Sequence, residues 1–204
     1  MHTTVVSFTL HRGKERPKGE PEYHVWQGTS QEFGEIRVRY PVPPHMPQAR
    51  MADVRGGFLP TATFESRGVH MDELTKPTLN GATLRVGDAV VYMKRNRWAV
   101  TNRGRALHLK YLGDRYRLRA INRKDYTLTR EPDAQDPGVV VIVKQSGIGR
   151  RRQLSVSVQG RALPADIALA TLFAGVDRSV LTRRGAVRAG LARVFHVAAE
   201  SAAT

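Results

Sequence analysis

The chain of 204 residues contains no cysteine, which excludes disulfide bonds and thiolate metal sites. It also has no apolar run that approaches the roughly 20 residues needed to span a bilayer as a helix. Its start, MHTTVVSFTLHRGKE, lacks the basic and then apolar segments of a secretory signal. We therefore expect a cytoplasmic protein without a transmembrane segment, whose contact with a membrane would be peripheral.

Motifs for catalysis are also missing. The seven histidines show no HxH or HExxH spacing, and no GxSxG sequence occurs. The acidic pairs Asp72 with Glu73 and Asp133 with Asp136 lie in turn-like surroundings. The sequence therefore predicts a protein that is not an enzyme, with no catalytic residue, no metal site and no cofactor.

Acidic residues are scarce beside basic ones. The chain has 33 Lys and Arg against 18 Asp and Glu, a formal net charge of +15, and an isoelectric point near 11.0. Such a charge attracts polyanions, including nucleic acids and anionic lipid headgroups. Abundant Arg together with Ala and Gly is also what a GC-rich genome produces. Composition alone leaves both interpretations open.

What the chain does contain is alternation of apolar and polar residues, the pattern of half-buried strands. Turn signals at 102–104, 113–114 and 122–125 separate the strands at meander spacing. The polar stretch 13–22 and the Pro/Gly-rich stretch 41–57 are predicted as loops. We expect about ten to twelve strands, among them TVVSFTLHR, GEIRVRYP, ATLRV, AVVYMKR, RWAVTN, ALHLKYL, RYRLRAI, DYTLTR, GVVVIVKQ and QLSVSV.

One late segment breaks this pattern. PADIALATLFAGVDRSVL, residues 164–181, predicts a helix with Pro164 in its first turn and Gly175 near its end. Thr171 is the one polar residue in its interior, so the helix should be buried on every side. Small residues would let the surrounding walls approach it closely: Ala165, Ala168, Ala170 and Ala174.

These features predict a mainly β fold, an antiparallel closed β-barrel of about 10–12 strands around a buried hydrophobic helix. The barrel and its central helix 164–176 form one domain, 1–178. Residues 179–204 are predicted as a C-terminal helical extension with an apolar stripe that includes Val187 and Leu191. Packing across the open end of the barrel is the favoured role of this helix. An oligomer contact and a membrane-surface helix remain open.

A late hydrophobic helix inside an antiparallel barrel resembles the tubby C-terminal-like superfamily, which includes tubby-like proteins, phospholipid scramblases and LURP-one-related proteins. The similar segment is 106–178. There ALHLKYLGDRYRLRAINRKDYTLTR resembles the late barrel strands, and QLSVSVQGRALPADIALATLFAGVDRS resembles the last strand and the central helix. The tubby C-terminal signature is absent. The resemblance implies the barrel and a role in binding lipid headgroups or proteins.

The strongest local excess of positive charge lies in residues 94–130, which contain twelve basic residues and two acidic ones. Strand alternation puts Arg115, Arg117 and Arg119 on one face at a spacing of about 7 Å, with Tyr116 and Leu118 on the other. Together with Lys110 these guanidinium groups are candidates for binding phosphate. The alternative is a solvated outer face of the barrel.

A second basic cluster is GIGRRRQL, with Arg150, Arg151 and Arg152. A strand follows it, so Gly147 and Gly149 indicate a hairpin rather than a nucleotide-binding loop. The three Arg are further candidates for binding an anion. Aromatic residues near the charge could stack on unpaired bases only if exposed, and Tyr116 and Tyr126 are predicted to be core.

Three functions follow. The favoured one is a non-enzymatic binding protein whose Arg-rich barrel surface engages acidic partners, anionic phospholipid headgroups first. The second is a structural, assembly or adaptor subunit that binds an acidic protein surface. The third is a nucleic-acid-binding module. The sequence does not fix the ligand, the biological process or the oligomeric state.

Overall fold

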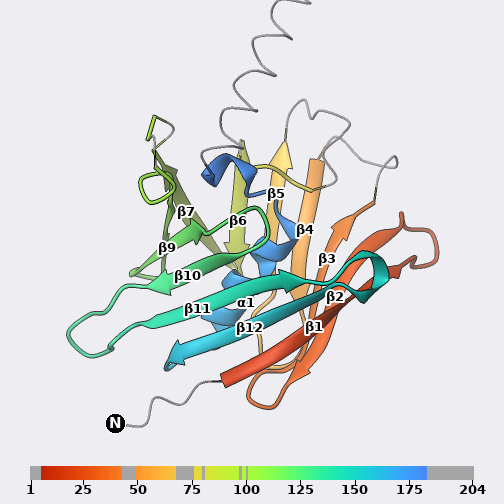
Figure 1. Cartoon of the computed structure of the whole chain (residues 1–204), viewed down its shortest axis with the longest axis horizontal. Helices are drawn as coiled ribbons and strands as arrows, with labels where there is room; N and C mark the ends of the chain where they lie inside the picture. The colour runs from red at the N-terminus through yellow and green to blue at the C-terminus, as the bar shows by residue number, and fades with distance from the viewer. Residues whose placement is uncertain are drawn as a thin grey trace, which may run out of the picture.

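The alternating segments form twelve strands in one closed antiparallel barrel (Figure 1). The computed structural model describes residues 6–42, 49–67, 76–79, 81–96, 98–99 and 101–182. The strands are β1 (Val6–Glu15), β2 (Tyr23–Ser30), β3 (Gly34–Pro41), β4 (Ala49–Arg55), β5 (Ala62–Arg67), β6 (Ala82–Val86), β7 (Ala89–Arg95), β8 (Leu107–Tyr111), β9 (Asp114–Ala120), β10 (Tyr126–Arg130), β11 (Val139–Ser146) and β12 (Gln153–Gly160).

Each strand pairs with the next along the chain, and the barrel closes where β1 pairs with β12. This last pairing runs from Val6 opposite Val158 to His11 opposite Gln153. Closure gives every strand a hydrogen-bonded neighbour on both sides, so no strand lies at a free sheet edge. The expected fold class is confirmed.

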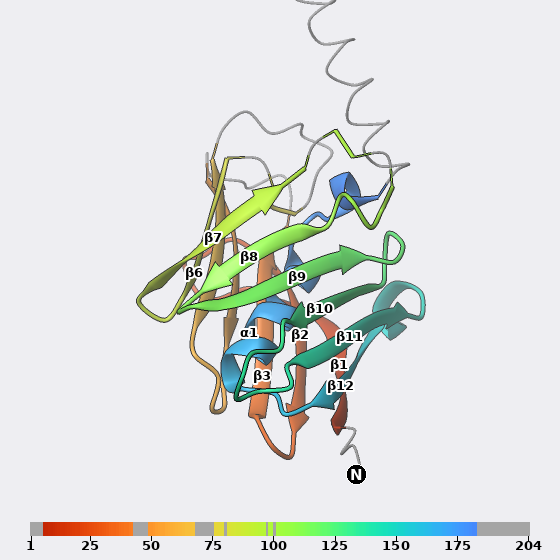
Figure 2. The same cartoon turned by 90° about the vertical axis from the view of Figure 1, so that its left-hand side faces the viewer.

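The interior holds a helix, as the sequence predicts. Helix α1 (Pro164–Leu172) is followed by the 3₁₀ turn η2 (Phe173–Gly175), and the residues from Asp166 to Gly175 are buried. A barrel of about eight strands is filled by its own side chains, and twelve strands leave a wider interior. Helix α1 fills that space and contacts β4, β5, β6, β10 and β11, enclosed by the strands in both views (Figures 1 and 2).

A buried polar network fixes the start of α1. Asp166 accepts hydrogen bonds from the Leu163 backbone N–H at 2.7 Å and from the Tyr116 hydroxyl at 2.9 Å. Arg130 Nε lies 3.2 Å from the same carboxylate, and another guanidinium nitrogen of Arg130 pairs with Asp136 at 3.0 Å. The network satisfies the backbone amide of the N-cap residue Leu163 through the carboxylate at N3, as in one half of a capping box.

The end of η2 depends on a residue without a side chain. A Cβ at Gly175 would lie 3.1 Å from the Ala52 Cβ and 3.3 Å from a ring carbon of Tyr40. Glycine therefore lets the end of the helical segment approach the wall formed by β3 and β4.

The barrel has two different ends. We call the end where η2 stops the mouth and the end where α1 begins the base. Antiparallel order puts the hairpin connections 16–22, 96–106, 121–125 and 147–152 at the mouth, and 31–33, 56–61, 87–88, 112–113, 131–138 and 161–163 at the base.

Several predicted boundaries are wrong. The predicted loop 41–57 contains β4, and β1 continues through Glu15 into the predicted loop 13–22. The described residues of RWAVTN lie in the connection after β7 rather than in a strand, and the predicted strands omitted β2 and β5. Leu181, in the 3₁₀ turn η3 (Ser179–Leu181), is buried in the core, so the packed chain passes 178. Most of the predicted extension, 183–204, lies outside the described residues.

Candidate functional site

The outer surface of β7, β8 and β9 carries a cluster of positive charge on the barrel wall. Tyr116 and Leu118 are 1% and 0% exposed, whereas Arg115, Arg117 and Arg119 lie on the opposite, solvent side of β9. The predicted division of this strand into two faces is confirmed. Lys110 of β8 is opposite Arg115 in the register and shares the outer side.

Cross-strand pairing extends this surface into an array. Tyr92 of β7 is opposite Lys110, which is opposite Arg115. One step further toward the mouth, Lys94 is opposite His108, which is opposite Arg117. Neighbouring strands lie about 4.8 Å apart and residues on one face repeat at about 7 Å. We call this surface the basic face: Tyr92, Lys94, His108, Lys110, Arg115, Arg117 and Arg119.

The charges of the basic face are not neutralised by carboxylates within the described chain. Lys94, Lys110 and the three arginines of β9 form no ion pair with a described residue. On β3 and β4 the opposite holds, because Arg37 pairs with Glu15 and Glu35, and Asp53 pairs with Arg39 and Arg55. A compositional excess of Arg does not explain why one surface is paired and the other is not.

Two exposed aromatic side chains adjoin the basic face. Tyr92 is 74% and Trp98 is 92% exposed, which is unusual for side chains of this size. Trp98 helps to line an open cleft of about 670 Å³ together with Lys94, Arg95, Asn96 and His108. Tyr116 and Tyr126 are buried, so their predicted core role is confirmed. Exposure meets the condition for stacking at Tyr92 and Trp98.

The second predicted cluster does not join the first. Two strands, β10 and β11, separate β9 from the connection that carries Arg151 and Arg152. Arg151 is exposed, whereas Arg152 is half-buried and shares the inward phase of Leu154. The side chain of Arg150 lies outside the described part. Gly147 and Gly149 both have positive φ in this connection, which confirms the predicted hairpin glycines.

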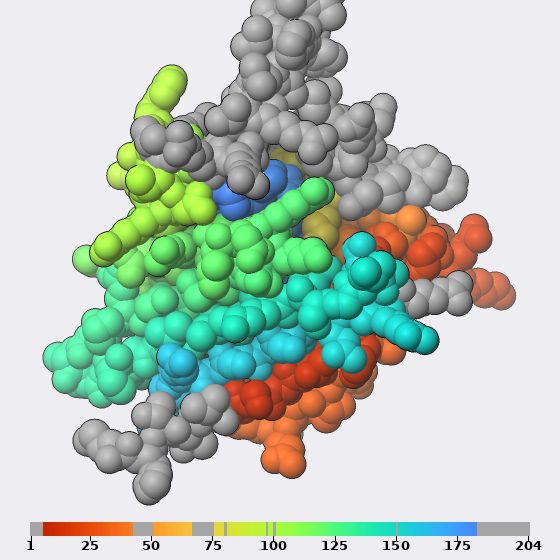
Figure 3. Space-filling model, in the orientation of Figure 1, coloured from red at the N-terminus to blue at the C-terminus, as the bar shows by residue number. Residues whose placement is uncertain are grey.

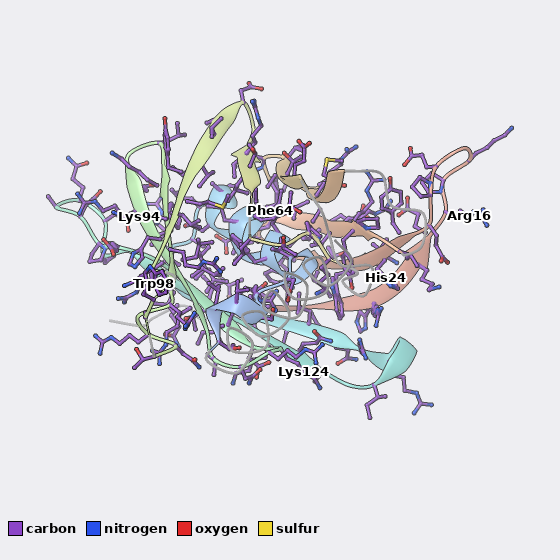
Figure 4. All side chains as sticks on the ribbon, turned by 90° about the horizontal axis from the view of Figure 1, so that it is seen from above. Arg16, His24, Phe64, Lys94, Trp98 and Lys124 are labelled. Atoms are coloured by element: carbon purple, nitrogen blue, oxygen red, sulfur yellow. The ribbon has the colours of Figure 1, made fainter. Side chains whose placement is uncertain are left out.

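The mouth connections combine cations with exposed apolar tips, a feature that the strand pattern did not predict. Ile148 is 86% and Ile121 is 48% exposed, and each lies within three residues of an exposed cation. The connection after β7, which carries Trp98, projects at the mouth near η3 (Figure 3). Viewed onto this end, Trp98, Lys124 and Arg16 lie at separate points around the rim (Figure 4). We call the mouth connections the basic rim.

The two ends differ in charge. In the described parts of the four mouth hairpins, eight cations stand against three carboxylates: Arg16, Lys18, Arg103, Arg105, Arg123, Lys124, Arg151 and Arg152 against Glu20, Glu22 and Asp125. In the six base connections, one cation stands against five carboxylates: Arg161 against Glu32, Asp88, Glu131, Asp133 and Asp136. Among the described residues of these ten connections, the mouth is therefore basic and the base acidic.

The part of the chain that the structure describes holds no group of three or more acidic or histidine side chains able to bind a metal. Within the same residues, no helix has the length and apolar content needed to cross a bilayer. Comparison of the chain with protein-family models, with curated proteins and with solved structures finds no match.

Proposed function

We propose that this protein is a non-enzymatic binding protein that docks its mouth end on anionic phospholipid headgroups, with the adjoining basic face as part of the contact. The observation that carries this proposal is the polarity of the barrel. Both ends expose apolar tips, such as Ile148 at the mouth and Phe58 and Leu112 at the base, but in the described residues cations accompany them at the mouth and carboxylates at the base. A membrane surface is an acidic partner that takes both features of the mouth at once.

The energetics agree with this assignment. Each Lys or Arg near an anionic leaflet contributes about 1 kcal/mol, and the attraction declines over about a Debye length. Side chains such as Trp98 and Ile148 add burial at the level of the headgroups. A single apolar side chain or a single cation binds a membrane weakly. Several such side chains on one rim bind the same surface together, and their combined affinity is much higher.

The experiment is co-sedimentation of nuclease-treated protein with vesicles of phosphatidylcholine alone or with phosphatidylserine, across a salt series. We expect binding to the anionic vesicles that weakens as salt rises. The double variant Arg123→Glu with Arg151→Glu changes four charge units on the rim, so its affinity should fall by about a hundredfold or more.

The matched control is Arg85→Glu with Arg161→Glu, which makes the same change in net charge through two exposed side chains outside the rim. This control should lose much less affinity than the rim variant. An equal loss of affinity in both variants would mean that binding depends only on the net charge of the protein, which would contradict docking by the mouth. Absence of binding at low salt would remove the proposal.

A second candidate is single-stranded nucleic acid, favoured by one observation: the exposed Tyr92 and Trp98 lie near Lys110 and Lys94, which form no ion pair with a described residue. Bases stack on such rings while cations follow the phosphates. Arg115→Glu, Arg117→Glu and Arg119→Glu together should abolish binding to labelled single-stranded oligonucleotides. Vesicle binding that persists in this triple variant would separate the rim from the basic face.

We also propose that the chain is a distant member of the tubby C-terminal-like superfamily. The support is architectural, since a closed antiparallel barrel around a late central helix is the fold that the resemblance implies. An adaptor role toward an acidic protein surface would use the same rim. It predicts a defined complex by light scattering in place of vesicle binding.

A further inference from the structure

Near the mouth, the positions of four adjacent strands that point into the barrel carry polar residues instead of apolar ones. Arg12, His24 and Tyr40 lie on β1, β2 and β3, and Arg152 directly precedes β12. Each continues the phase of buried residues on its strand: Leu10, Trp26, Val38 and Leu154. Register brings them together, because His24 is opposite Tyr40 and the Arg12 N–H donates to the Arg152 carbonyl at 3.1 Å.

Two more cations, Lys76 and Arg178, lie between these residues and the end of the helical segment. The six residues Arg12, His24, Tyr40, Lys76, Arg152 and Arg178 form a cluster that we call the chamber. Lys76 donates to the Ala174 carbonyl, and Arg178 donates to the carbonyls of Phe173 and Val176. Both act as caps at the negative end of the helical segment. The Lys76 Nζ lies 4.9 Å from the centre of the Tyr40 ring, so these cations adjoin the strand wall at Tyr40.

The chamber holds more positive charge than the described chain neutralises. Arg12 Nη2 lies 3.3 Å from the ring nitrogens of His24, and the Arg152 side chain forms no ion pair with a described residue. Of the nearby carboxylates, Glu22 pairs with Lys14, and the charge of Asp177, which accepts a hydrogen bond from Ser179, acts on Lys76 and Arg178. The four cations Arg12, Lys76, Arg152 and Arg178 outnumber this carboxylate and repel one another.

Two titrating groups respond to this environment. Burial, with the charges of Arg12 and Lys14, lowers the pKa of His24 to about 4. Burial, with the charge of Arg178 and further cations, lowers the pKa of Lys76 to about 7. The Arg178 Nε is buried without a hydrogen-bond partner in the described structure. This unused donor and the excess positive charge both favour an anionic acceptor.

We propose that the chamber binds a small, doubly charged oxyanion of the phosphate class. Arg12 and Arg152 hold it from the wall, Lys76 holds it from the side of the helical segment, and the Tyr40 hydroxyl donates a further hydrogen bond. Guanidinium groups suit this ligand because their planar donors match two oxygens of a phosphate at once. The bound anion relieves the repulsion among the cations and so stabilises the folded barrel.

This site lies inside the mouth and shares Arg152 with the basic rim, whose exposed cations contact a surface from outside. The phosphate belongs either to a free anion or to the phosphomonoester headgroup of a lipid. The chemistry at Arg12, Arg152 and Lys76 is the same in both cases, and the experiment distinguishes the sources.

The first arm is calorimetric titration of the full chain with inorganic phosphate at constant ionic strength. We expect saturable binding, one site per chain, and a loss of roughly tenfold or more in affinity for Arg12→Gln with Arg152→Gln. The control Arg16→Gln with Arg151→Gln removes the same charge from the rim and keeps the wild-type affinity. No heat of binding, or equal affinity in both variants, overturns the proposal. Circular dichroism verifies that each variant is folded.

The second arm uses sulfate, whose charge is constant between pH 6 and 8. Lys76 faces Arg12, Arg152, Arg178, Asp177, Tyr40 and His24, and its own pKa of about 7 lies in that range. Affinity should fall severalfold as pH rises through about 7, because Lys76 loses its charge. Lys76→Met should remove this dependence. A pH-independent affinity in the wild type contradicts the role of Lys76.

The third arm compares vesicles containing phosphatidic acid, which carries a phosphomonoester, with vesicles containing phosphatidylserine. If the chamber takes a headgroup, Arg12→Gln with Arg152→Gln loses the preference for phosphatidic acid and keeps salt-sensitive docking. If it takes a free anion, the variant binds both vesicles like the wild type and fails in calorimetry alone. Failure of the rim variant on all vesicles concerns the proposed function and leaves the calorimetric result intact.

Discussion

The mouth and the base of the barrel are built from the same kind of hairpin, yet they use charge in opposite ways. At the base, the central charges are paired and buried, as Arg130 is between Asp166 and Asp136. At the mouth, Arg12 and Arg152 have no carboxylate partner in the described chain. The base therefore secures the helix in the barrel, and the mouth keeps charge available for something outside the chain.

The largest expected effect breaks the base. Asp166→Ala removes one carboxylate partner of the buried Arg130 guanidinium. It also removes the acceptor of the hydrogen bond from the Leu163 N–H. The free energy of unfolding in urea should fall by about 3–5 kcal/mol. Arg152→Gln at the mouth removes a repelling charge, so its unfolding free energy should equal or exceed that of the wild type. Comparable destabilisation by both changes would show that the two ends are energetically alike.

A smaller effect tests which end meets a membrane. Ile148→Asp and Leu112→Asp alter two side chains of similar exposure, 86% at the mouth and 77% at the base. The first should weaken binding to anionic vesicles by about tenfold, through lost apolar burial and a repelling charge. The second should leave the sedimented fraction unchanged. Equal weakening would mean that the barrel lies on its side.

The smallest effect concerns pH. Lys76 has a pKa near 7 in the folded protein against an ordinary value of 10.5, so above pH 7 the unfolded chain binds more protons than the folded one. Unfolding free energy should therefore rise with pH from about 7 toward 10 in chloride buffer. Lys76→Met should show a flatter profile in a series of urea midpoints. An identical slope in the variant would assign the titration elsewhere.

Sequence periodicity was enough to predict the closed barrel, its central helix and nine of its twelve strands. The helix at 164–176 and the two-faced strand 114–120 are local patterns, because each can be seen in fewer than about twenty residues. Strand β4 was missed because it follows a Pro-rich stretch, and the Pro/Gly content of 41–57 outweighed the alternation of Ala52 and Val54 with polar neighbours. Only pairing with β3 and β5 decides that segment.

The candidate site was predictable only in part. The face of Arg115, Arg117 and Arg119 follows from alternation alone, but the absence of acidic partners depends on which strands adjoin β9. The chamber in the mouth joins Arg12 to Arg178 across almost the whole chain, so no local pattern contains it. One signal was present in the sequence: Arg12 occupies the next inward-facing position of β1 after Phe8 and Leu10. An inward-facing Arg indicates a polar site inside the barrel.

Closure by β1 and β12 also determines when the protein can fold. The partner of the first strand is the last one, and the helix that fills the interior follows that strand in the chain. During synthesis, eleven strands leave the ribosome before the barrel can close, and their apolar inner surface has no core to cover it. Folding dominated by such distant contacts is slow and exposed to aggregation. The nascent chain should therefore depend on chaperones until residues 153–176 have emerged.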